Sequence, residues 1–294
     1  MKPEKICIIC INPAFGNAGT LQRAIGCNIV AESLEPKGFH KNCTKPIRGF
    51  DNIPDADHYI FVGSGVMLRI NVSSLEGRKS VVITDSHYLE YTDEIDKIIK
   101  DNNIEVSCML DLWYLCKHEK RVYFQPFDQL RLSNKKNKKL TICHSPSVKV
   151  FSNQKGSAQI KTAVERAIGK KNIHYECITS DTWSGTMEKK SKSHIFIDQL
   201  VISNHYQHKG YVGGIGKSGI EAMLLKCLTI SCGTPIDTDV PAPPYVVANT
   251  VDELAQKLKY YIENKKEREL IITKQYEWAK KYTSMKNVAK RLLL

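Results

Sequence analysis

Residues 210–233, GYVGGIGKSGIEAMLLKCLTISCG, place a glycine-rich loop directly before a helical stretch that is followed by a β-branched strand. A loop with little side-chain bulk lets backbone N–H groups approach a ligand, and the positive end of the helix dipole favours a phosphate group there. Glu221, in the first turns of this helix, is placed to reach a pair of ribose hydroxyls. The stretch therefore predicts a nucleotide-diphosphate site. The residues predicted to form it are Gly216, Lys217, Ser218, Gly219 and Glu221.

The same stretch raises the alternative of a P-loop, because Gly216-Lys217-Ser218 is like the second half of that motif. A P-loop requires a glycine at position 211, where this chain has Tyr. The preceding residues 203–209 are a polar loop rather than a strand. We therefore exclude a P-loop. A glycine-rich helix entry that packs closely and binds nothing is the structural alternative.

Apolar runs of strand length alternate with helical stretches along the chain, which is typical of α/β domains with parallel sheets. The predicted strands are 6–11, 59–62, 80–84, 105–110, 121–124, 140–143, 174–179, 194–197, 228–232 and 245–247. The predicted helices are 20–30, 93–101, 157–167, a short one at Glu188, 217–225, 251–263 and a long final helix, 265–294. The polar segment 129–139 is predicted to be a linker.

The length of 294 residues favours two domains. We expect an α/β fold of two Rossmann-like, doubly wound domains that face each other across a cleft. The expected boundaries are 1–132 for the first domain and 140–275 for the second. The C-terminal helical residues 276–294 are expected to pack back on the first domain.

The formal net charge is +12, from 43 lysines and arginines against 31 acidic residues, and the excess is clustered, for example at 135–139 and 189–192. Such a field attracts nucleic acid, anionic lipid or diphosphate substrates, although a lysine-rich solvated surface is the alternative. No run of 18 apolar residues exists, so no transmembrane segment is expected. Most of the ten cysteines lie in apolar stretches, which indicates buried thiols in a reducing cytoplasm, bacterial or of a phage-infected host.

Five motifs follow one another in the second half of the chain. They are His144-Ser145-Pro146-Ser147, Lys155-Gly156-Ser157, the strand at 195–200, the loop and helix at 214–223, and the segment 243–249. This order resembles the C-terminal nucleotide-sugar domain of GT-B glycosyltransferases, especially the retaining family-four group, over roughly 140–294. The first half is similar to that fold only through its strand pattern and the loop Gly16-Asn17-Ala18-Gly19.

The resemblance implies a hexosyl- or pentosyltransferase whose donor is a nucleotide-diphosphate sugar, by default a uridine diphosphate sugar, with no covalent cofactor and no required metal. Glu221 matches the glutamate that holds the donor ribose, and Lys155 matches the lysine that neutralises the leaving diphosphate. The Ser218-Gly219 backbone would cap the phosphates, with Gly16 on the donor side. Two positions depart from the pattern, because a glutamate is replaced by Gly213 and an arginine by Val150. Lys149 is a candidate for that second charge.

Asp85 and His87 follow the predicted strand 80–84, at the edge of a parallel sheet where ligands bind. The resemblance implies that an Asp or His from this region contacts the sugar or deprotonates the acceptor, and a carboxylate near an imidazole suits that chemistry. The catalytic candidates are therefore Asp85, His87 and Lys155. A turn-capping Asp beside a surface His is the structural alternative. The loop at 63–65 is a candidate approach for sugar or acceptor, or else a tight turn.

Three hypotheses remain for the partner. The acceptor is a hydroxymethylated pyrimidine base in double-stranded DNA, as for phage-type enzymes of this fold, or it is a lipid-linked or cell-surface glycan reached at an anionic membrane surface. The third hypothesis is a non-catalytic protein that binds nucleic acid or a sugar nucleotide. The compact first domain, with no amphipathic membrane helix expected in it, favours the first hypothesis over the second. The third leaves the donor motifs unexplained.

Overall fold

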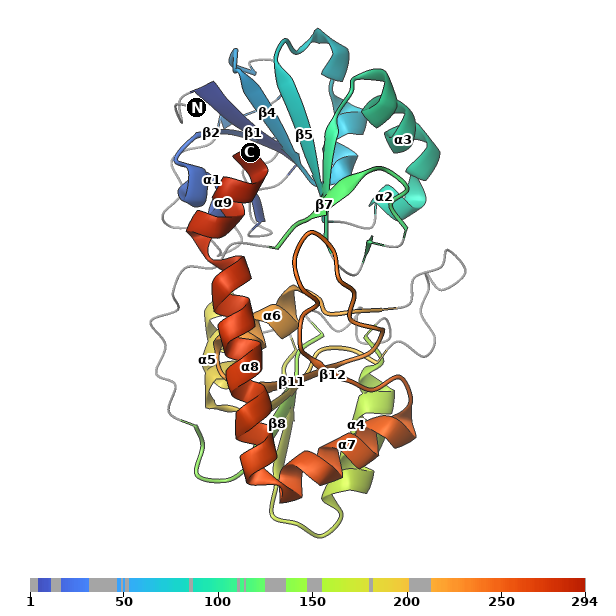
Figure 1. Cartoon of the computed structure of the whole chain (residues 1–294), viewed down its shortest axis with the longest axis vertical. Helices are drawn as coiled ribbons and strands as arrows, with labels where there is room; N and C mark the ends of the chain where they lie inside the picture. The colour runs from blue at the N-terminus through green and yellow to red at the C-terminus, as the bar shows by residue number, and fades with distance from the viewer. Residues whose placement is uncertain are drawn as a thin grey trace. The chain divides into compact units, whose positions relative to one another are not determined.

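The computed structural model describes residues 5–11, 17–31, 47–48, 50, 53–84, 87–109, 112–113, 115–124, 136–146, 155–179, 182–200 and 213–293. The chain forms two compact units (Figure 1). Unit 1 consists of Met1–Asp128 together with Thr283–Leu294, and unit 2 consists of Gln129–Tyr282. The last helix of the chain, α9 (Met285–Leu293), therefore belongs to the same unit as the N-terminal half.

In unit 1, the described strands form a seven-stranded parallel sheet in the order β3-β2-β1-β4-β5-β6-β7. This is the strand order of a Rossmann fold, with the order reversing between β1 and β4. The strands are β1 (Ile6–Cys10), β2 (Asn28–Ala31), β3 (Ile47–Arg48), β4 (His58–Val62), β5 (Arg78–Ile83), β6 (Glu105–Cys108) and β7 (Lys120–Val122). Every residue of β1 and β4 is buried, as expected for central strands of a covered parallel sheet.

The helices of unit 1 are α1 (Asn17–Ile25), α2 (His87–Glu90), α3 (Thr92–Asp101) and α9, with 3-10 turns at Ser64–Arg69 and Val72–Ser74. α1 packs against β1, β2 and α9. Two arginines hold the end of α9, because Arg78 donates a hydrogen bond to the Leu293 carbonyl and Arg121 donates one to the Arg291 carbonyl. Cations are favourable at this negative end of a helix, so they fix α9 to the strands of unit 1.

In unit 2, the described strands form a five-stranded parallel sheet in the order β12-β11-β10-β8-β9. The chain leaves β8 toward β9 on one side and leaves β10 toward β11 on the other. The strand order thus reverses between β8 and β10, where open sheets of this kind bind ligands. The strands are β8 (Thr141–His144), β9 (His174–Cys177), β10 (Ile195–Ile197), β11 (Leu228–Ser231) and β12 (Val246–Val247).

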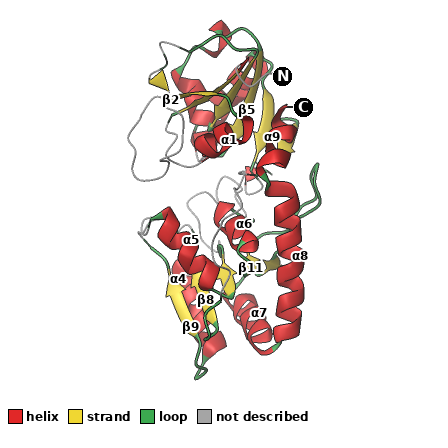
Figure 2. Cartoon of the chain, turned by 90° about the vertical axis from the view of Figure 1, so that its left-hand side faces the viewer, coloured by secondary structure: helices red, strands yellow, loops and turns green. Residues whose placement is uncertain are grey.

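Helices cover both faces of this second sheet (Figure 2). On one face, α4 (Ser157–Ile168), α7 (Val251–Glu263) and Ile272 of α8 (Lys265–Thr283) pack against Ile142, Ile195 and Ile230. On the other face, α5 (Trp183–Lys192) and α6 (Lys217–Leu224) pack against Cys143 and Phe196. Neighbouring residues of one strand therefore face different helices, as the two-residue period of a strand requires.

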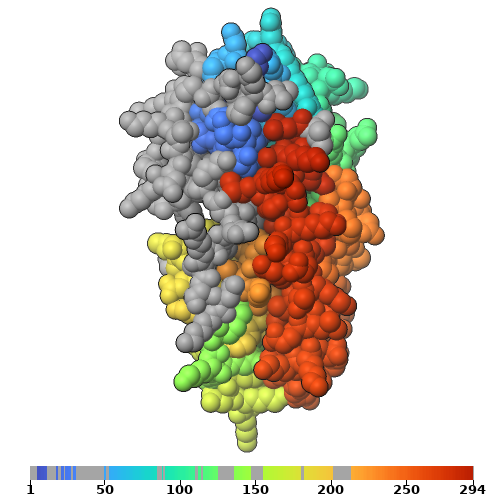
Figure 3. All heavy atoms as spheres, turned by 60° about the vertical axis from the view of Figure 1, so that its left-hand side comes forward, coloured from blue at the N-terminus to red at the C-terminus, as the bar shows by residue number. Residues whose placement is uncertain are grey.

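α8 lies along the surface of unit 2 (Figure 3). Its exposed residues include the charged Lys265, Lys266, Glu267, Glu269, Lys274, Glu277 and Lys280. Its inner face carries Gln275, which is buried, accepts a hydrogen bond from the Thr229 backbone N–H and donates to the carbonyls of Thr229 and Pro244. Trp278 of the same helix donates to the Pro241 carbonyl at 2.9 Å. These side-chain contacts hold α8 against β11 and against the segment that precedes β12.

The structure corrects three details of the predicted elements. The helix predicted over 20–30 ends at Ile25, where Gly26 takes a φ of 79°, and the next residues form β2 beside β1. The long final helix is interrupted after Thr283 and resumes as α9. The short strand β3 and the 3-10 turns have no counterpart in the prediction. The linker predicted at 129–139 lies largely outside the described residues.

None of the nine cysteines that the structure describes belongs to a disulfide, and eight of them are buried. This confirms the expected buried thiols for those residues. Across the described ranges, we find no helix with the length and apolar character needed to cross a membrane.

Candidate functional site

The glycine-rich loop of unit 2 leads into α6 as predicted, and its glycines are required by close packing. Gly213 and Gly214 take φ values of 86° and 142°, and the Gly214 carbonyl accepts hydrogen bonds from Gln199 and Ser231. A Cβ atom on Gly233 would lie 2.9 Å from the Gly214 nitrogen, so Gly233 leaves space for this loop. The loop is therefore held rigidly at the carboxyl end of β10 and β11.

The amino end of α6 offers backbone donors to a ligand. Gly216 is the residue before the helix, in extended conformation, and no side chain caps the first turn. The N–H groups of Gly219 and Ile220 bond back to the Gly216 carbonyl. Helix geometry leaves the N–H groups of Lys217 and Ser218 without a helical partner, at the positive end of the dipole. This is the arrangement in which helices bind phosphate groups.

The buried carboxylate of Asp198 links Lys155 to this loop. Its ammonium group lies 3.1 Å from Oδ1 of Asp198, and the Gly216 N–H donates to Oδ2 of the same side chain at 2.6 Å. Asp198 directly follows β10 and is not exposed, whereas the Lys155 side chain is 20% exposed. The structure thus brings Lys155, from the turn before α4, beside the amino end of α6.

Glu221 lies on the buried side of α6. Its Oε2 accepts a hydrogen bond from Lys190 at 2.7 Å and its Oε1 accepts one from the Trp183 indole at 3.1 Å, both from α5. The Lys190 ammonium also donates to the Ser218 hydroxyl at 2.6 Å and lies 4.8 Å from the centre of the Phe196 ring. The side chains of Lys190 and Glu221 are almost completely buried, at 1% and 4% exposure. Glu221 is therefore engaged by protein partners, which the sequence does not indicate.

The charges around Glu221 shift its titration. Burial would raise the pKa of Glu221, but Lys190 and Lys217 outweigh this effect and hold its pKa below the ordinary value. Burial and Lys190 lower the pKa of Lys217, against the opposing effect of Glu221. The beginning of α6 therefore gathers three lysines, Lys155, Lys190 and Lys217, against two carboxylates, Asp198 and Glu221.

His144, at the end of β8, is a buried histidine with defined partners. Its Nδ1 lies 2.8 Å from the Ile197 carbonyl, which only accepts, so Nδ1 carries the proton. Its Nε2 lies 2.8 Å from the Ser157 hydroxyl, which then donates to it. Burial lowers the pKa of His144 to about 4, with Lys155 acting in the same direction. The neutral ring fixes the start of α4 next to Lys155.

This histidine predicts a pH dependence of stability. Because its folded pKa of about 4 lies below the ordinary 6.5, the unfolded chain binds the proton more readily between these values. The free energy of unfolding should fall as pH drops from 6.5 to 4, by at most about 3 kcal/mol for this group. Denaturant unfolding of wild type and His144→Gln across this range should show a flatter profile for the variant. Parallel profiles would contradict the assignment.

Several predicted residues lie outside the described part of the chain. They are Gly16, Asp85 and Lys149, and the side chain of His87, which begins α2. The structure therefore leaves the pairing of Asp85 with His87 as a prediction. Gly63, with a φ of 85°, turns the chain into the 3-10 helix, where Ser64 and Gly65 are buried, so this segment is the tight turn.

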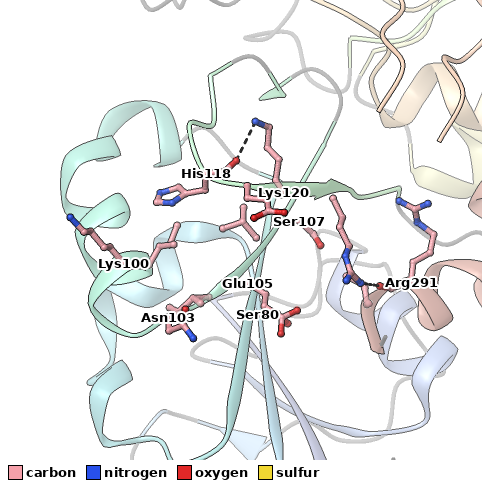
Figure 4. A pocket seen from close by; sticks show the side chains of 14 residues that line it. Ser80, Lys100, Asn103, Glu105, Ser107, His118, Lys120 and Arg291 are labelled. Carbon is pink, nitrogen blue, oxygen red and sulfur yellow. Dashed lines mark hydrogen bonds between the residues drawn. The ribbon is translucent and has the colours of Figure 1, made fainter. Parts of the chain in front are cut away.

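A hollow of about 540 Å³ lies elsewhere, in unit 1 (Figure 4). Figure 4 shows Glu105 and Ser80 between Lys100 on one side and Arg291 on the other. Glu105 and Lys120 are the first residues of β6 and β7, so the hollow lies toward the amino ends of these strands. Ligands of parallel sheets bind at the carboxyl ends, and this hollow is therefore not our acceptor candidate. Among the residues with described positions, no cluster of His, Cys, Asp and Glu is arranged to hold a metal ion.

Solved structures share this fold over the whole chain. An alpha-glucosyltransferase, solved in complex with UDP and a 13-mer DNA containing an HMU base, superimposes with a TM-score of 0.66 at 11% identity. The match covers 99% of this chain and 98% of that one. A glycosyltransferase from Rickettsia africae matches with a TM-score of 0.62 at 11% identity, over 99% and 97% of the two chains.

Sucrose-phosphate synthase from Thermosynechococcus elongatus matches with a TM-score of 0.61 at 11% identity, over 98% and 97% of the chains. No protein-family model and no curated protein sequence matches this chain. The two parallel sheets, their strand orders and these full-length matches establish the fold: the chain is an α/β protein of the GT-B type, the fold of glycosyltransferases.

Proposed function

We propose that the protein is a glycosyltransferase that takes its sugar from a nucleotide-diphosphate donor, with UDP as the nucleotide, bound in unit 2. The observation that carries this proposal is the meeting of Lys155 and the amino end of α6 at one carboxylate. Both lie beside the point where the strand order of the second sheet reverses. Structures of the same fold were solved in complex with UDP or UDP-glucose.

The reaction needs positive groups where the nucleotide leaves. When the bond between the sugar and the diphosphate breaks, negative charge develops on the departing phosphate oxygen. The Lys155 ammonium and the N–H groups of Lys217 and Ser218 would stabilise that charge because they are fixed in advance. Lys149 would add a second cation.

Glu221 would contact the donor ribose. Lys190 and Trp183 each use one of its oxygens, and a carboxylate oxygen can accept a further hydrogen bond. In this proposal Lys190 orients the carboxylate, and a ribose hydroxyl adds to it when the donor binds. Asp85 and His87 would serve the acceptor and the transferred sugar, and Gly16 would contact the donor.

For the acceptor, we propose a hydroxymethylated pyrimidine base in double-stranded DNA. The net charge of +12 suits a polyanionic partner. Two of the matching structures, both alpha-glucosyltransferases, were solved with DNA, one with an HMU base and one with an abasic site. The target base would have to leave the helix stack to meet the sugar.

Two assays test these steps in order. Calorimetry with UDP and a screen of UDP-sugar hydrolysis test the donor site, and donor binding without turnover would indicate a non-catalytic binder. Transfer of a radiolabelled sugar to duplexes with hydroxymethylated or unmodified pyrimidines then tests the acceptor. We expect label only in the hydroxymethylated duplex, decreasing steeply with salt. A protein that hydrolyses the donor and labels neither duplex would overturn the DNA assignment.

A glycan acceptor is the second candidate. The S. aureus TarM structure, solved with UDP and alpha-GlcNAc-glycerol, matches 80% of this chain with a TM-score of 0.57 and 14% identity. This chain spans about half of TarM, because the match covers 54% of that chain. Transfer to a lipid-linked or cell-surface glycan, with sedimentation of the protein on anionic vesicles, would favour this candidate.

A further inference from the structure

Asp198 connects the two parts of the donor site, and its position is set by the sheet. Its backbone N–H donates to the Ile230 carbonyl at 2.9 Å, which continues the pairing of β10 with β11 by one residue. The side chain then lies at the carboxyl end of β10 without solvent exposure. One oxygen contacts the Lys155 ammonium and the other accepts from the Gly216 N–H.

The Asp198 carboxylate is closely packed between α6 and the turn that carries Lys155. A Cβ atom on Gly219 would lie 3.0 Å from Oδ2 and 3.1 Å from Cγ of Asp198, so the helix approaches the carboxylate as closely as a glycine permits. On the other side, the Leu200 N–H donates to the Lys155 carbonyl at 3.0 Å. The turn that carries Lys155 is therefore fixed through its backbone and through its side chain.

The pair of Lys155 with Asp198 differs from the other buried pair of this unit. Lys190 and Glu221 are both enclosed, at 1% and 4% exposure, whereas Lys155 keeps 20% of its side chain open while Asp198 has none. A buried ion pair adds little net stability compared with apolar side chains of the same size. A half-open pair at the end of a strand thus fits a ligand site better than a structural brace.

We infer that Asp198 is a positioning residue for the transfer reaction. It holds the Lys155 ammonium and the amino end of α6 at fixed positions relative to each other, where both can bind the diphosphate. This inference rests on the proposed function. Asp198 does not touch the donor. It acts through Lys155 and Gly216, so that both meet the leaving phosphate without rearrangement.

The test compares Asp198→Asn, Lys155→Met and the double variant. Asparagine keeps the shape but loses one acceptor, so we expect kcat for donor turnover to fall about 10- to 100-fold, with a smaller change in KM. In the Lys155→Met background, the same change should lower kcat by a smaller factor than in the wild type, because one of the two groups that Asp198 positions is gone. The inference would be overturned if the fold losses in kcat of the two single variants multiplied in the double variant. It would also be overturned if Asp198→Asn turned over the donor at the wild-type rate.

Asp198→Glu provides a second variant that keeps the charge and displaces it. A role limited to charge balance predicts wild-type turnover for this variant, whereas positioning predicts at least a tenfold loss. Gln275→Leu, which breaks buried hydrogen bonds of α8 in the same unit, controls for loss of stability alone and should keep its turnover. A wild-type protein that neither binds UDP nor hydrolyses any UDP-sugar would instead refute the proposed function, and with it the role of Asp198.

Discussion

Replacing Lys155 with methionine is expected to slow sugar transfer about 100- to 1000-fold at saturating donor, the size of effect seen when one fixed group is removed from a developing anion. Methionine keeps the apolar stem of the side chain and removes the ammonium that lies 3.1 Å from Asp198 at the start of α6. The charge on the leaving diphosphate then lacks its fixed cation. Steady-state release of UDP from the preferred donor measures the effect.

Lys161→Met is the matched control. Lys161 lies on α4, six residues further along the chain, with 65% of its side chain exposed and a long contact of 3.8 Å to Glu165. Its loss should leave turnover unchanged, because an exposed ion pair contributes little. Since Lys155→Met removes the ionic partner of buried Asp198, its unfolding temperature must be measured too. A folded Lys155→Met protein with wild-type turnover would remove Lys155 from the mechanism.

The donor side of the site could be predicted from the sequence because its parts lie in short continuous segments. The loop of glycines and the helix after it predict α6 within one residue, and Lys155 precedes the predicted helix at 157–167, which the structure has as α4. Their meeting could not be predicted. It depends on β8 and β10 lying side by side in the sheet, which brings Lys155 to the carboxylate of Asp198, 43 positions further along the chain.

Lys190 shows where composition misleads. In the sequence it belongs to the basic run at 189–192, which suggests a solvated surface. In α5 it follows Trp183 and Met187 at helical spacing, so it lies on the face that turns toward the core. The helical spacing of these residues therefore indicates that Lys190 is buried. This can be read from the sequence only if the helix is predicted to begin at Trp183, whereas our prediction has only a short helix at Glu188.

The segment from β1 to β2 shows a second limit. Apolar residues continue past Ile25, so a helix over 20–30 satisfies a simple pattern. Gly26, with its left-handed φ of 79°, ends α1, and Ile29 and Val30 are buried in a strand parallel to β1. Glycine as a helix stop was visible in the sequence. The strand was not, because its four residues acquire their structure from pairing with β1.

Gly156→Ala is expected to lower the unfolding temperature of unit 2 by about 10 °C, more than Gly169→Ala does. The two glycines flank α4, and both have a positive φ: Gly156 is left-handed helical (φ 71°, ψ 36°), whereas Gly169 has φ 53° and ψ −124°, outside that region. An alanine carries a strain of about 1 kcal/mol at Gly156 and of about 1–3 kcal/mol at Gly169. At Gly156 the new Cβ would also lie 2.0 Å from the Leu200 carbonyl oxygen, a backbone atom that cannot rotate away.

At Gly169 no atom lies within 4 Å of the new Cβ, so Gly169→Ala measures the conformational strain alone. An effect of Gly156→Ala beyond that of Gly169→Ala then reports the close approach of the Lys155 turn to Leu200, two residues past Asp198. Gly156→Ala should also weaken UDP binding, because moving this turn moves Lys155, whereas Gly169→Ala should bind UDP as wild type does. Equal unfolding temperatures for the two variants would mean that the turn is not packed against Leu200, and equal UDP affinities would mean that its position does not matter to the donor.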